Sequence, residues 1–407
     1  MLQEECKEKI LSEEYRDFMM RDTGALGKNF PLENGCRIPL KYGFELFYID
    51  QSEDRKKSLA DYPYTMVPKC YTTLDMAAIQ QAGIAAVQNI PGLELSGEGV
   101  LVGIIDTGIN YLDPIFRNLD GSTRIQRIWD QEEQSGTAPR GIGYGSEYTK
   151  EQINQAILSE NPKETVPSFD TDGHGTFVAS VACGGANPEN LFIGAAPEAE
   201  MVIVKLKEAK EYLREYYFVD RDARCYQEND LVAAVFYLQK VQEELKRPLV
   251  ICLAVGTSFG GHGGYSILSE YLQNVAASEG IGIVTGSGNE ADKRHHYLGI
   301  LEQENNLPVE INVGNNTRGF VMELWTELPN LLALSIASPT GQTVGPISLK
   351  RGIGEYVFVF EQTRVIFNYR VLVETTGAQL AFFQFERPGS GIWKIIPETL
   401  ELGNGIF

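Results

Sequence analysis

Residues 100–108 read VLVGIIDTG, an apolar run that ends in an aspartate, a threonine and a glycine. Such a run followed by a turn is typical of an inner strand of a parallel sheet. In open α/β sheets, ligand sites lie just beyond the carboxyl ends of the strands. Asp106 is therefore well placed for function, although an aspartate that begins a turn is also common for purely structural reasons.

Runs of the same kind alternate with helical periodicity on both sides of this stretch. Near-continuous apolar strands that alternate with helices indicate a doubly wound, mostly parallel sheet covered on both faces, which is an α/β fold. We assign residues 66–310 to this domain. The expected strands are 100–105, 201–206, 249–255 and 281–285, and the expected helices are 75–87, 229–246 and 266–278.

Two smaller units flank the α/β domain. In residues 1–65, apolar side chains recur at helical spacing from Leu2 to Met19, and 44–49 then resemble a strand, so we expect a small α+β segment. In residues 311–407 the helical pattern vanishes, and short strands separated by turn signals predict a β-sandwich or jelly roll. The strands expected there are 319–325, 331–337, 356–360, 365–373, 380–385 and 392–396.

Composition excludes several classes of partner. The chain has 407 residues and a formal net charge of −20, which repels phosphate backbones, so we expect no nucleic acid. No run approaches the roughly 20 apolar residues of a membrane span, so we expect no membrane. The first ten residues, MLQEECKEKI, lack the basic start and apolar stretch of a secretory signal, and ordinary secretion is not expected.

The six cysteines lie far apart and form no CxxC pair. Disulfide frameworks are typical of short secreted chains, and this chain is long. We therefore expect all six to be reduced and structural.

Residues 170–176 read DTDGHGT and lead into an apolar helical pattern. The glycines leave space around the imidazole, and a helix should begin near Asp172 or His174. A histidine in this setting can face a cleft, which makes His174 a candidate for chemistry. The first residues also resemble a calcium loop in part, but an EF-hand would need oxygen ligands where His174 and Val181 stand, so that site is rejected.

Residues 281–290 read IGIVTGSGNE, so that another apolar strand ends in glycines and a polar amide. A neutral amide such as that of Asn289 is a good donor to a developing oxyanion. An asparagine after a glycine is also typical of a tight turn with a purely structural role.

Asp106, His174 and Asn289, in this order and within these local sequences, resemble the subtilases, over residues 70–300. The resemblance implies that Asp106 holds the His174 tautomer and stabilises the imidazolium. It implies that His174 acts as general base and then general acid. Asn289 would donate to the oxyanion of the tetrahedral intermediate.

Ala254, Val255 and Gly256 stand where the family has Ser-Leu-Gly, an extended segment whose backbone pairs with the substrate as an added strand. Ala254 departs from the usual serine. This departure puts fine positioning of the substrate in doubt, not the fold.

The family's nucleophile lies in Gly-Thr-Ser-Met-Ala-x-Pro after the oxyanion Asn, and no such segment follows Asn289. A Gly-Thr-Ser does occur at 256–258, but it precedes Asn289 and continues as Phe-Gly-Gly, so Ser258 is not the expected nucleophile. Two explanations remain open. Either the serine lies beyond Phe407, or the protein is an inactive pseudopeptidase that binds a peptide or partner.

A subtilase with a jelly roll inserted after the Asn segment is similar to the clostridial Csp-type germination peptidases. In that group, residues 1–65 would correspond to the propeptide, and a cytoplasmic or spore-associated location would follow. The resemblance implies a serine endopeptidase whose partners are a protein or peptide substrate and its own propeptide. No cofactor is expected; calcium sites are common in the family, but the sequence does not place one.

An aspartic peptidase is the remaining alternative, because Asp-Thr-Gly occurs twice, at 22–24 and 106–108. Such enzymes use two matched loops that share one proton. The copy at 22–24 follows an amphipathic helical pattern instead of an apolar strand, so the two loops do not match.

Overall fold

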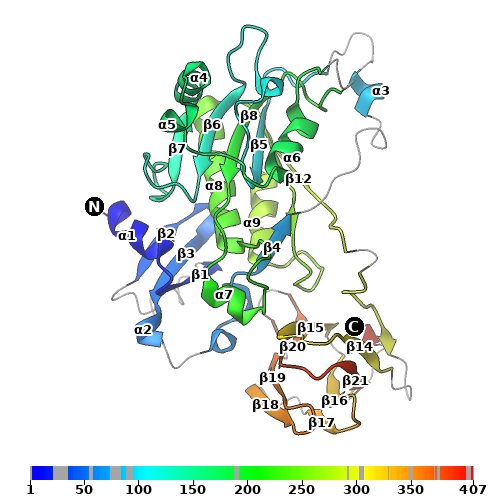
Figure 1. The fold of residues 1–407 in the computed structure, drawn as a ribbon. Coiled ribbons are helices and arrows are strands. Elements are labelled where there is room, and N and C mark those ends of the chain that lie inside the picture. The colour runs from blue at the N-terminus through cyan, green and yellow to red at the C-terminus, as the bar shows by residue number, and fades with distance from the viewer. Residues whose placement is uncertain are drawn as a thin grey trace.

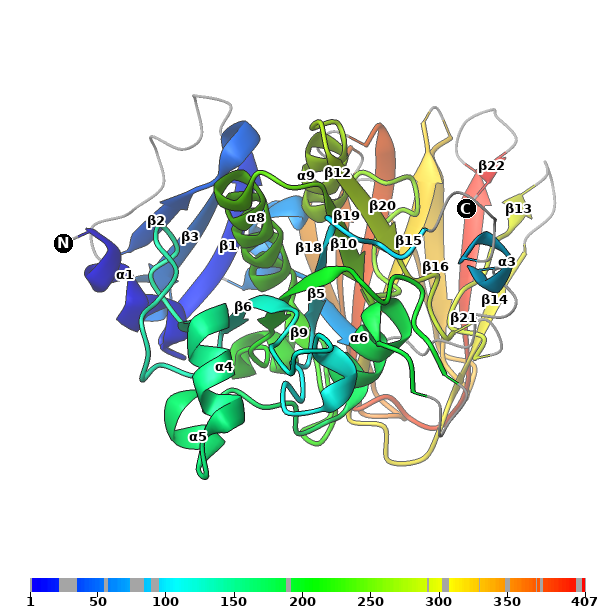
Figure 2. The ribbon, with the colours of Figure 1, turned by 90° about the horizontal axis from the view of Figure 1, so that it is seen from above.

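The computed structural model shows an α/β domain flanked by an N-terminal segment and a C-terminal β-rich region (Figures 1 and 2). The residues it describes are 2–21, 35–54, 58–73, 84–88, 95–187, 192–290, 293–301, 307–328, 330–347, 352–370, 372–373, 376–399 and 405–406.

The central sheet has six strands in the order β12-β10-β5-β8-β6-β7. Neighbouring strands run parallel from β12 to β6, and only β7 is antiparallel to its neighbour. The prediction of a mostly parallel α/β sheet is confirmed. The strands are β5 (Leu101–Asp106), β6 (Ile125–Asp130), β7 (Ser146–Thr149), β8 (Glu200–Lys205), β10 (Leu249–Leu253) and β12 (Ile281–Thr285).

Helices cover both faces of this sheet (Figure 2). On β5, Ile105 packs into the apolar cluster that contains α8, whereas Ile104 packs into the cluster that contains α6, because successive side chains of a strand point to opposite faces. A Cβ on Gly103 would lie 2.6 Å from Leu238 Cδ1, so the glycine lets α8 approach the sheet closely. The helices of this domain are α3 (Ile84–Gln88), α4 (Lys150–Leu158), α5 (Pro162–Thr165), α6 (His174–Cys183), α7 (Glu211–Tyr216), α8 (Glu228–Leu245) and α9 (Ile267–Ala276), with a short 3₁₀ helix η4 (Pro114–Phe116).

A second, smaller sheet lies beside the central one. Its order is β11-β4-β9, and β4 pairs antiparallel with both neighbours. The strands are β4 (Cys70–Thr73), β9 (Tyr226–Gln227) and β11 (Val255–Gly256). Of the helix expected over 75–87, the described part is α3, and residues 74–83 lie outside the described residues.

The N-terminal segment departs from its prediction. The helix ends at Leu11, and Tyr15, Phe18 and Met19 lie on a strand of a three-stranded sheet ordered β1-β3-β2. The helical prediction is wrong here because β1 is buried on both faces from Asp17 to Met20. Its sequence therefore lacks the alternation of apolar and polar residues that would indicate a strand. The elements are α1 (Leu2–Leu11), β1 (Tyr15–Arg21), β2 (Cys36–Pro39), η1 (Lys41–Gly43), β3 (Phe44–Asp50), α2 (Gln51–Asp54), η2 (Leu59–Asp61) and η3 (Tyr64–Met66).

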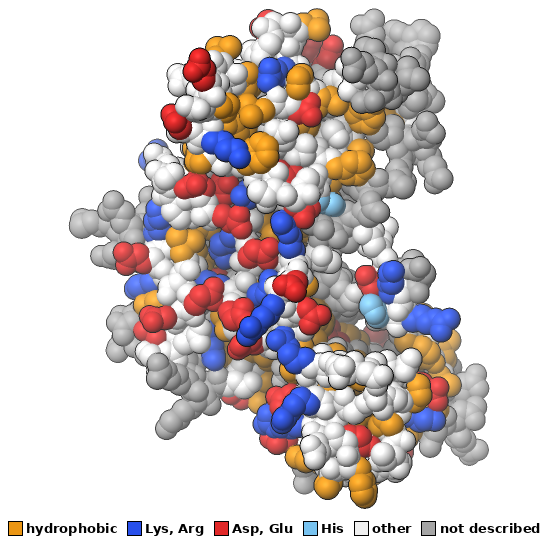
Figure 3. All heavy atoms as spheres, in the orientation of Figure 1, with side chains coloured by type: hydrophobic (Ala, Val, Ile, Leu, Met, Phe, Trp, Pro, Cys, Tyr) orange, Lys and Arg blue, Asp and Glu red, His pale blue; other side chains and the backbone are white. Residues whose placement is uncertain are grey.

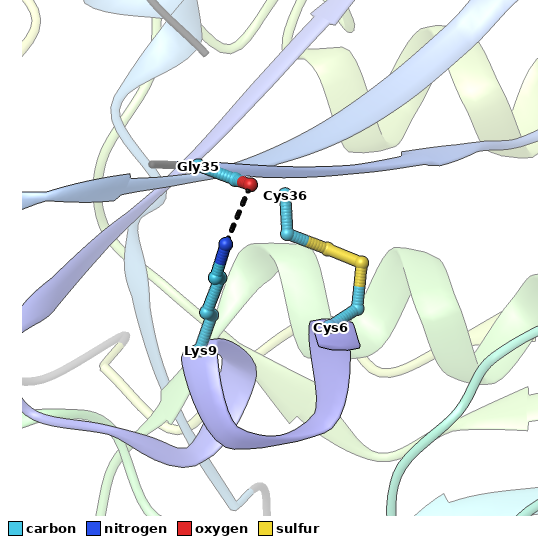
Figure 4. Close-up of a disulfide and its surroundings, with 4 residues drawn as sticks. All are labelled: Cys6, Lys9, Gly35 and Cys36. Carbon is cyan, nitrogen blue, oxygen red and sulfur yellow. Dashed lines mark hydrogen bonds between the residues drawn. A yellow bond between two sulfur atoms is a disulfide. The ribbon is translucent and has the colours of Figure 1, made fainter. Parts of the chain in front are cut away.

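A disulfide joins Cys6 of α1 to Cys36 of β2 (Figure 4). The Cα atoms are 5.4 Å apart, and the Lys9 ammonium donates to the Gly35 carbonyl beside the bridge. The prediction that all six cysteines are reduced is wrong for this pair, because a separation of 30 residues leaves no motif in the sequence. The other four cysteines are free.

The C-terminal region contains two four-stranded antiparallel sheets, ordered β14-β21-β16-β17 and β15-β20-β19-β18. Side chains from both sheets, among them Leu334, Phe383 and Trp393, form one apolar cluster. All six strands expected here are present, and β14, β17 and β22 were not predicted. The strands are β14 (Val309–Val313), β15 (Gly319–Glu327), β16 (Leu332–Ala337), β17 (Thr343–Ile347), β18 (Gly352–Phe358), β19 (Thr363–Arg370), β20 (Ala378–Glu386) and β21 (Gly391–Thr399), and β13 (Ile300–Leu301) pairs with β22 (Gly405–Ile406).

Buried ion pairs lie where the N-terminal segment meets the α/β domain. Asp17 of β1 lies 2.5 Å from the Lys210 ammonium, and Asp230 of α8 lies 2.6 Å from that of Lys207. All four side chains are buried. On the outside, acidic and basic side chains are intermixed over the face seen in Figure 3.

The described residues contain no helix that combines the length and apolar character needed to span a membrane.

Candidate active site

Asp106 and His174 meet at the carboxyl edge of the central sheet. Asp106 is the last residue of β5, His174 is the first of α6, and Asp106 Oδ1 lies 2.7 Å from His174 Nδ1. The Asp106 side chain is fully buried and that of His174 is 16% exposed. The Thr107 N–H donates to the same carboxylate oxygen at 2.7 Å. An imidazole held through Nδ1 in this way transfers protons through Nε2.

Asp170 fixes the turn that carries His174. Its Oδ1 accepts hydrogen bonds from the Thr107 hydroxyl and the Gly173 N–H, both at 2.9 Å. Its Oδ2 accepts from the N–H and the hydroxyl of Thr176, at 2.9 and 2.6 Å. Burial alone would raise the pKa of Asp170, but these hydrogen bonds outweigh it and hold the pKa below its ordinary value.

The sequence suggests only a partial calcium loop around Asp170, and this positioning role was not predicted. The available signal was the spacing of Asp170, Gly173 and Thr176 around the turn. The donors to Asp170 are N–H and O–H groups, which occupy the oxygens that a calcium ion would need. Among the described residues, no group of three or more histidines, cysteines and acids is arranged to hold a metal ion.

Two glycine-containing motifs pack directly against each other. A Cβ on Gly175 would lie 2.3 Å from the Gly108 carbonyl oxygen, a distance that no side chain tolerates. The Gly175 N–H donates to the Thr107 hydroxyl at 2.8 Å. The residues that follow Asp106 and His174 therefore hold the loop after β5 against the first turn of α6.

Asn289 lies four residues beyond the end of β12, and β12 ends at the same edge of the sheet as β5. Its side chain is exposed. Within the described residues, no hydrogen bond joins Asn289 to Asp106 or His174. The structure thus brings the first two candidates into contact and places the third at the same edge of the sheet.

Val255 and Gly256 form β11, which is paired with a strand of the chain itself. Val255 pairs with Thr73 and Gly256 with Thr72 of β4, and Ala254 is buried just before them. The opposite side of β4 pairs with β9.

Strand β9 connects this small sheet to Asp106 and His174. Tyr226 of β9 lies close to Asp106, and burial together with the charges of Glu208 and Asp106 raises its pKa. Arg224, two residues earlier, forms an ion pair at 3.4 Å with Asp172, in the turn before His174. The small sheet therefore lies next to Asp106 and His174.

Ser258 is exposed in the segment after β11. Within the described part of the chain, it makes no hydrogen bond to His174.

Comparisons with known proteins place these features in one family. The model of the subtilase family matches residues 97–317, more than half of the chain. The CspB protease of Clostridium perfringens has a similar structure, with a TM-score of 0.67 and 28% identity, covering 79% of this chain and 64% of CspB.

Among curated sequences, the chain is similar to the subtilisin-like protease SBT2.2 of Arabidopsis thaliana. The identity is 33% over 102 residues, which are 23% of this chain and 12% of the relative. SBT3.6 of the same plant is 23% identical over 355 residues, which cover 80% of this chain and 42% of the relative. The chain thus matches less than half the length of these relatives.

The matched family is not that of the aspartic peptidases, and the second Asp-Thr-Gly, at 22–24, lies outside the described residues. The family match, the similar structure and the Asp106–His174 contact lead to the same conclusion. The chain belongs to the subtilase family.

Proposed function

We propose that the protein is a serine endopeptidase that hydrolyses peptide bonds by acyl transfer, with Asp106, His174 and Asn289 as the residues that this chain contributes. The observation that carries the proposal is the 2.7 Å contact between a buried carboxylate and a partly exposed imidazole at the carboxyl edge of the sheet. This pairing orients the imidazole and stabilises the imidazolium that forms during the reaction.

The chemistry follows from these roles. His174 accepts the proton of a serine hydroxyl as its oxygen attacks the carbonyl carbon, and Asp106 stabilises the resulting positive charge. The Asn289 amide donates to the carbonyl oxygen as it becomes negative. His174 then returns the proton to the leaving amine, and water releases the acyl group by the reverse sequence.

The nucleophilic serine, in this proposal, belongs to the chain that follows Phe407, and residues 311–407 are a jelly-roll-like insertion before it. Strand β12 supports this arrangement, because it lies at the end of the sheet and its Val284 is 57% exposed. Tyr297, Leu298 and Ile300 are exposed nearby in the sequence. Exposed apolar residues beside a sheet edge fit a segment that packs there.

The test is to express the protein together with the residues that follow Phe407 and treat it with a fluorophosphonate probe, which modifies activated serines. We expect labelling that His174→Ala abolishes. A folded, extended protein that takes no label contradicts the proposal, and labelling of Ser258 in the present chain contradicts the placement of the nucleophile.

We further propose that the N-terminal segment is a propeptide and that β4 occupies the position of a substrate. Strand β4 is extended and pairs on both sides, with β11 and with β9, as a bound peptide would. The scissile bond would then lie shortly after Thr73. N-terminal sequencing of the extended protein should find a new end within residues 74–83, and His174→Ala should remain uncut.

The alternative is a pseudopeptidase that binds a peptide or partner. Ala254, in place of the family's serine, favours it. This alternative predicts that no Gly-Thr-Ser-Met-Ala segment follows Phe407.

A further inference from the structure

Glu228 places a buried carboxylate beside the strand that we assign to the substrate position. It is the first residue of α8 and follows directly after β9, the partner of β4. Its side chain has no exposed surface. A carboxylate in such a place is stable only where donors or cations face it.

Lys69, which immediately precedes β4, supplies one backbone donor and a nearby cation. The Lys69 N–H donates to Glu228 Oε2 at 3.2 Å, and the Glu228 N–H donates to the Lys69 carbonyl at 3.0 Å. The Lys69 ammonium lies 3.8 Å from the same Oε2, and only 3% of the Lys69 side chain is exposed. The contact thus combines backbone pairing, which any residue could make, with an ion pair that requires a basic side chain.

Tyr71 reaches the same carboxylate from two residues further along the strand. Burial, the Glu228 charge and a hydrogen bond to Glu228 together raise the pKa of the Tyr71 phenol. Alternate residues of a strand point to the same side, so Lys69 and Tyr71 both face Glu228. The other oxygen of Glu228, Oε1, accepts from the Leu268 N–H at 3.4 Å, which ties the carboxylate to the start of α9.

We propose that Glu228 determines substrate specificity: it selects peptides with a basic residue at the position of Lys69 and a tyrosine at the position of Tyr71. Lys69 and Tyr71 lie four and two residues before Thr73, which pairs with Val255. This inference rests on the proposed peptidase function. A peptide without these two side chains would leave the buried carboxylate with backbone N–H donors alone and no cation, and sites of this kind discriminate against such analogues.

The first experiment requires no catalysis, because the chain carries its own strand. Amide hydrogen exchange of residues 69–72 is measured in the 1–407 chain and in Glu228→Gln. We expect exchange about 10- to 100-fold faster in the variant, the range for losing a hydrogen bond to a charged group. Glu151→Gln, a change in the first turn of α4 away from β4, is the matched control and should leave exchange unchanged.

Lys69→Met and Tyr71→Phe provide the same test from the strand side, and they serve if Glu228→Gln does not fold. Each should also accelerate exchange over residues 69–72. Unchanged exchange in all three folded variants overturns the proposal.

The second experiment uses the extended protein and peptides with the sequence of residues 69–73 before the cleaved bond. They carry Lys, Met or Glu at the first position and Tyr or Phe at the third. We expect kcat/KM to be about tenfold higher for Lys than for Met, lowest for Glu, and the Lys-to-Met ratio to fall towards one in Glu228→Gln. An equal ratio in both proteins overturns the proposal. If no peptide is cleaved at all, the proposed function fails, while the exchange experiment still decides whether Glu228 recognises the strand.

Discussion

The imidazole of His174 keeps its place because several neighbours fix the first turn of α6. Asp170 accepts hydrogen bonds from that turn and from Thr107, which follows Asp106. Gly175 allows the turn to touch the loop after β5. The geometry of the Asp106–His174 contact therefore depends on the surrounding backbone as much as on the two side chains.

Asp106→Asn tests the role of the carboxylate in the peptidase activity that we propose for the extended protein. An amide can donate to Nδ1 and hold the wrong tautomer, so kcat should fall by about 10⁴-fold with little change in KM. Steady-state kinetics on one peptide measure both constants, and Glu151→Gln should match the parent. A loss of kcat below tenfold would show that Asp106 is not the orienting residue.

Asp170→Asn should reduce stability in a pH-dependent way. The folded pKa of Asp170 is lowered, so its contribution is fully present above the unfolded value of about 3.9 and is lost as the pH falls through the folded pKa. The urea midpoint of the variant should therefore lie below that of the parent at pH 7, and the gap should narrow at pH 3. The exposed Asp222→Asn is the control. A gap of the same size at both pH values would contradict this reading.

At the residue level, the sequence could single out Asp106 and His174 because each lies beside glycines at the junction of an apolar strand or helix. It could not reveal the part played by Asp170. An aspartate in such a turn can bind a calcium ion or accept hydrogen bonds from the neighbouring backbone. The Thr107 hydroxyl, whose hydrogen bond to Asp170 distinguishes the two roles, lies far away in the chain.

Between elements, buried charges join the N-terminal segment to the α/β domain. Asp17 of β1 faces Lys210 and also accepts from the side-chain amides of Gln227 and Asn229. The net stabilisation by such a pair is smaller than the free energy of unfolding that is lost when one partner is removed. The remaining partner is then a buried, unpaired charge.

Asp17→Ala should therefore destabilise the folded chain by about 3–5 kcal/mol. Chemical denaturation measures the loss, and Lys210→Met in the same background should recover part of it. The exposed ion pair of Glu355 and Arg364 offers the contrast, since Glu355→Ala should change stability far less than Asp17→Ala does. Equal effects of the two changes would show that burial of the Asp17 pair contributes nothing.

Strands β5, β8, β10 and β12 followed from sequence because they are mostly apolar, and α8 and α9 because their apolar residues are periodic. Strands β6 and β7 were not predicted, because polar residues interrupt IQRIWD and SEYT. Strand β1 was not predicted either, because its buried residues also fit a helix. Strand β17 is interrupted by Gly345 and Pro346, which read as a turn. The pairing of β4 with β9 and β11 could not be foreseen, since it joins residues more than a hundred positions apart.

On the scale of the whole molecule, the Cys6–Cys36 bridge constrains the N-terminal segment in the unfolded state. A loop of 30 residues corresponds to about 3–4 kcal/mol in the chain-entropy model. The double variant Cys6→Ser, Cys36→Ser should lose about this much stability under oxidising conditions. With a reductant present, parent and variant should unfold together, and a difference that persists there would show that the serines, not the lost bridge, cause the effect.

The central sheet ends at β12, which among the described strands has a neighbour on one side only. In the part of the chain that the structure describes, no strand pairs with its outer rim, and Val284 on this strand is exposed. Such a rim is a template for strand addition, and in a concentrated solution the nearest available strand belongs to another molecule. At high concentration, the 407-residue chain should therefore polymerise through this rim. A segment of the same protein that pairs with the rim would keep the molecules monomeric.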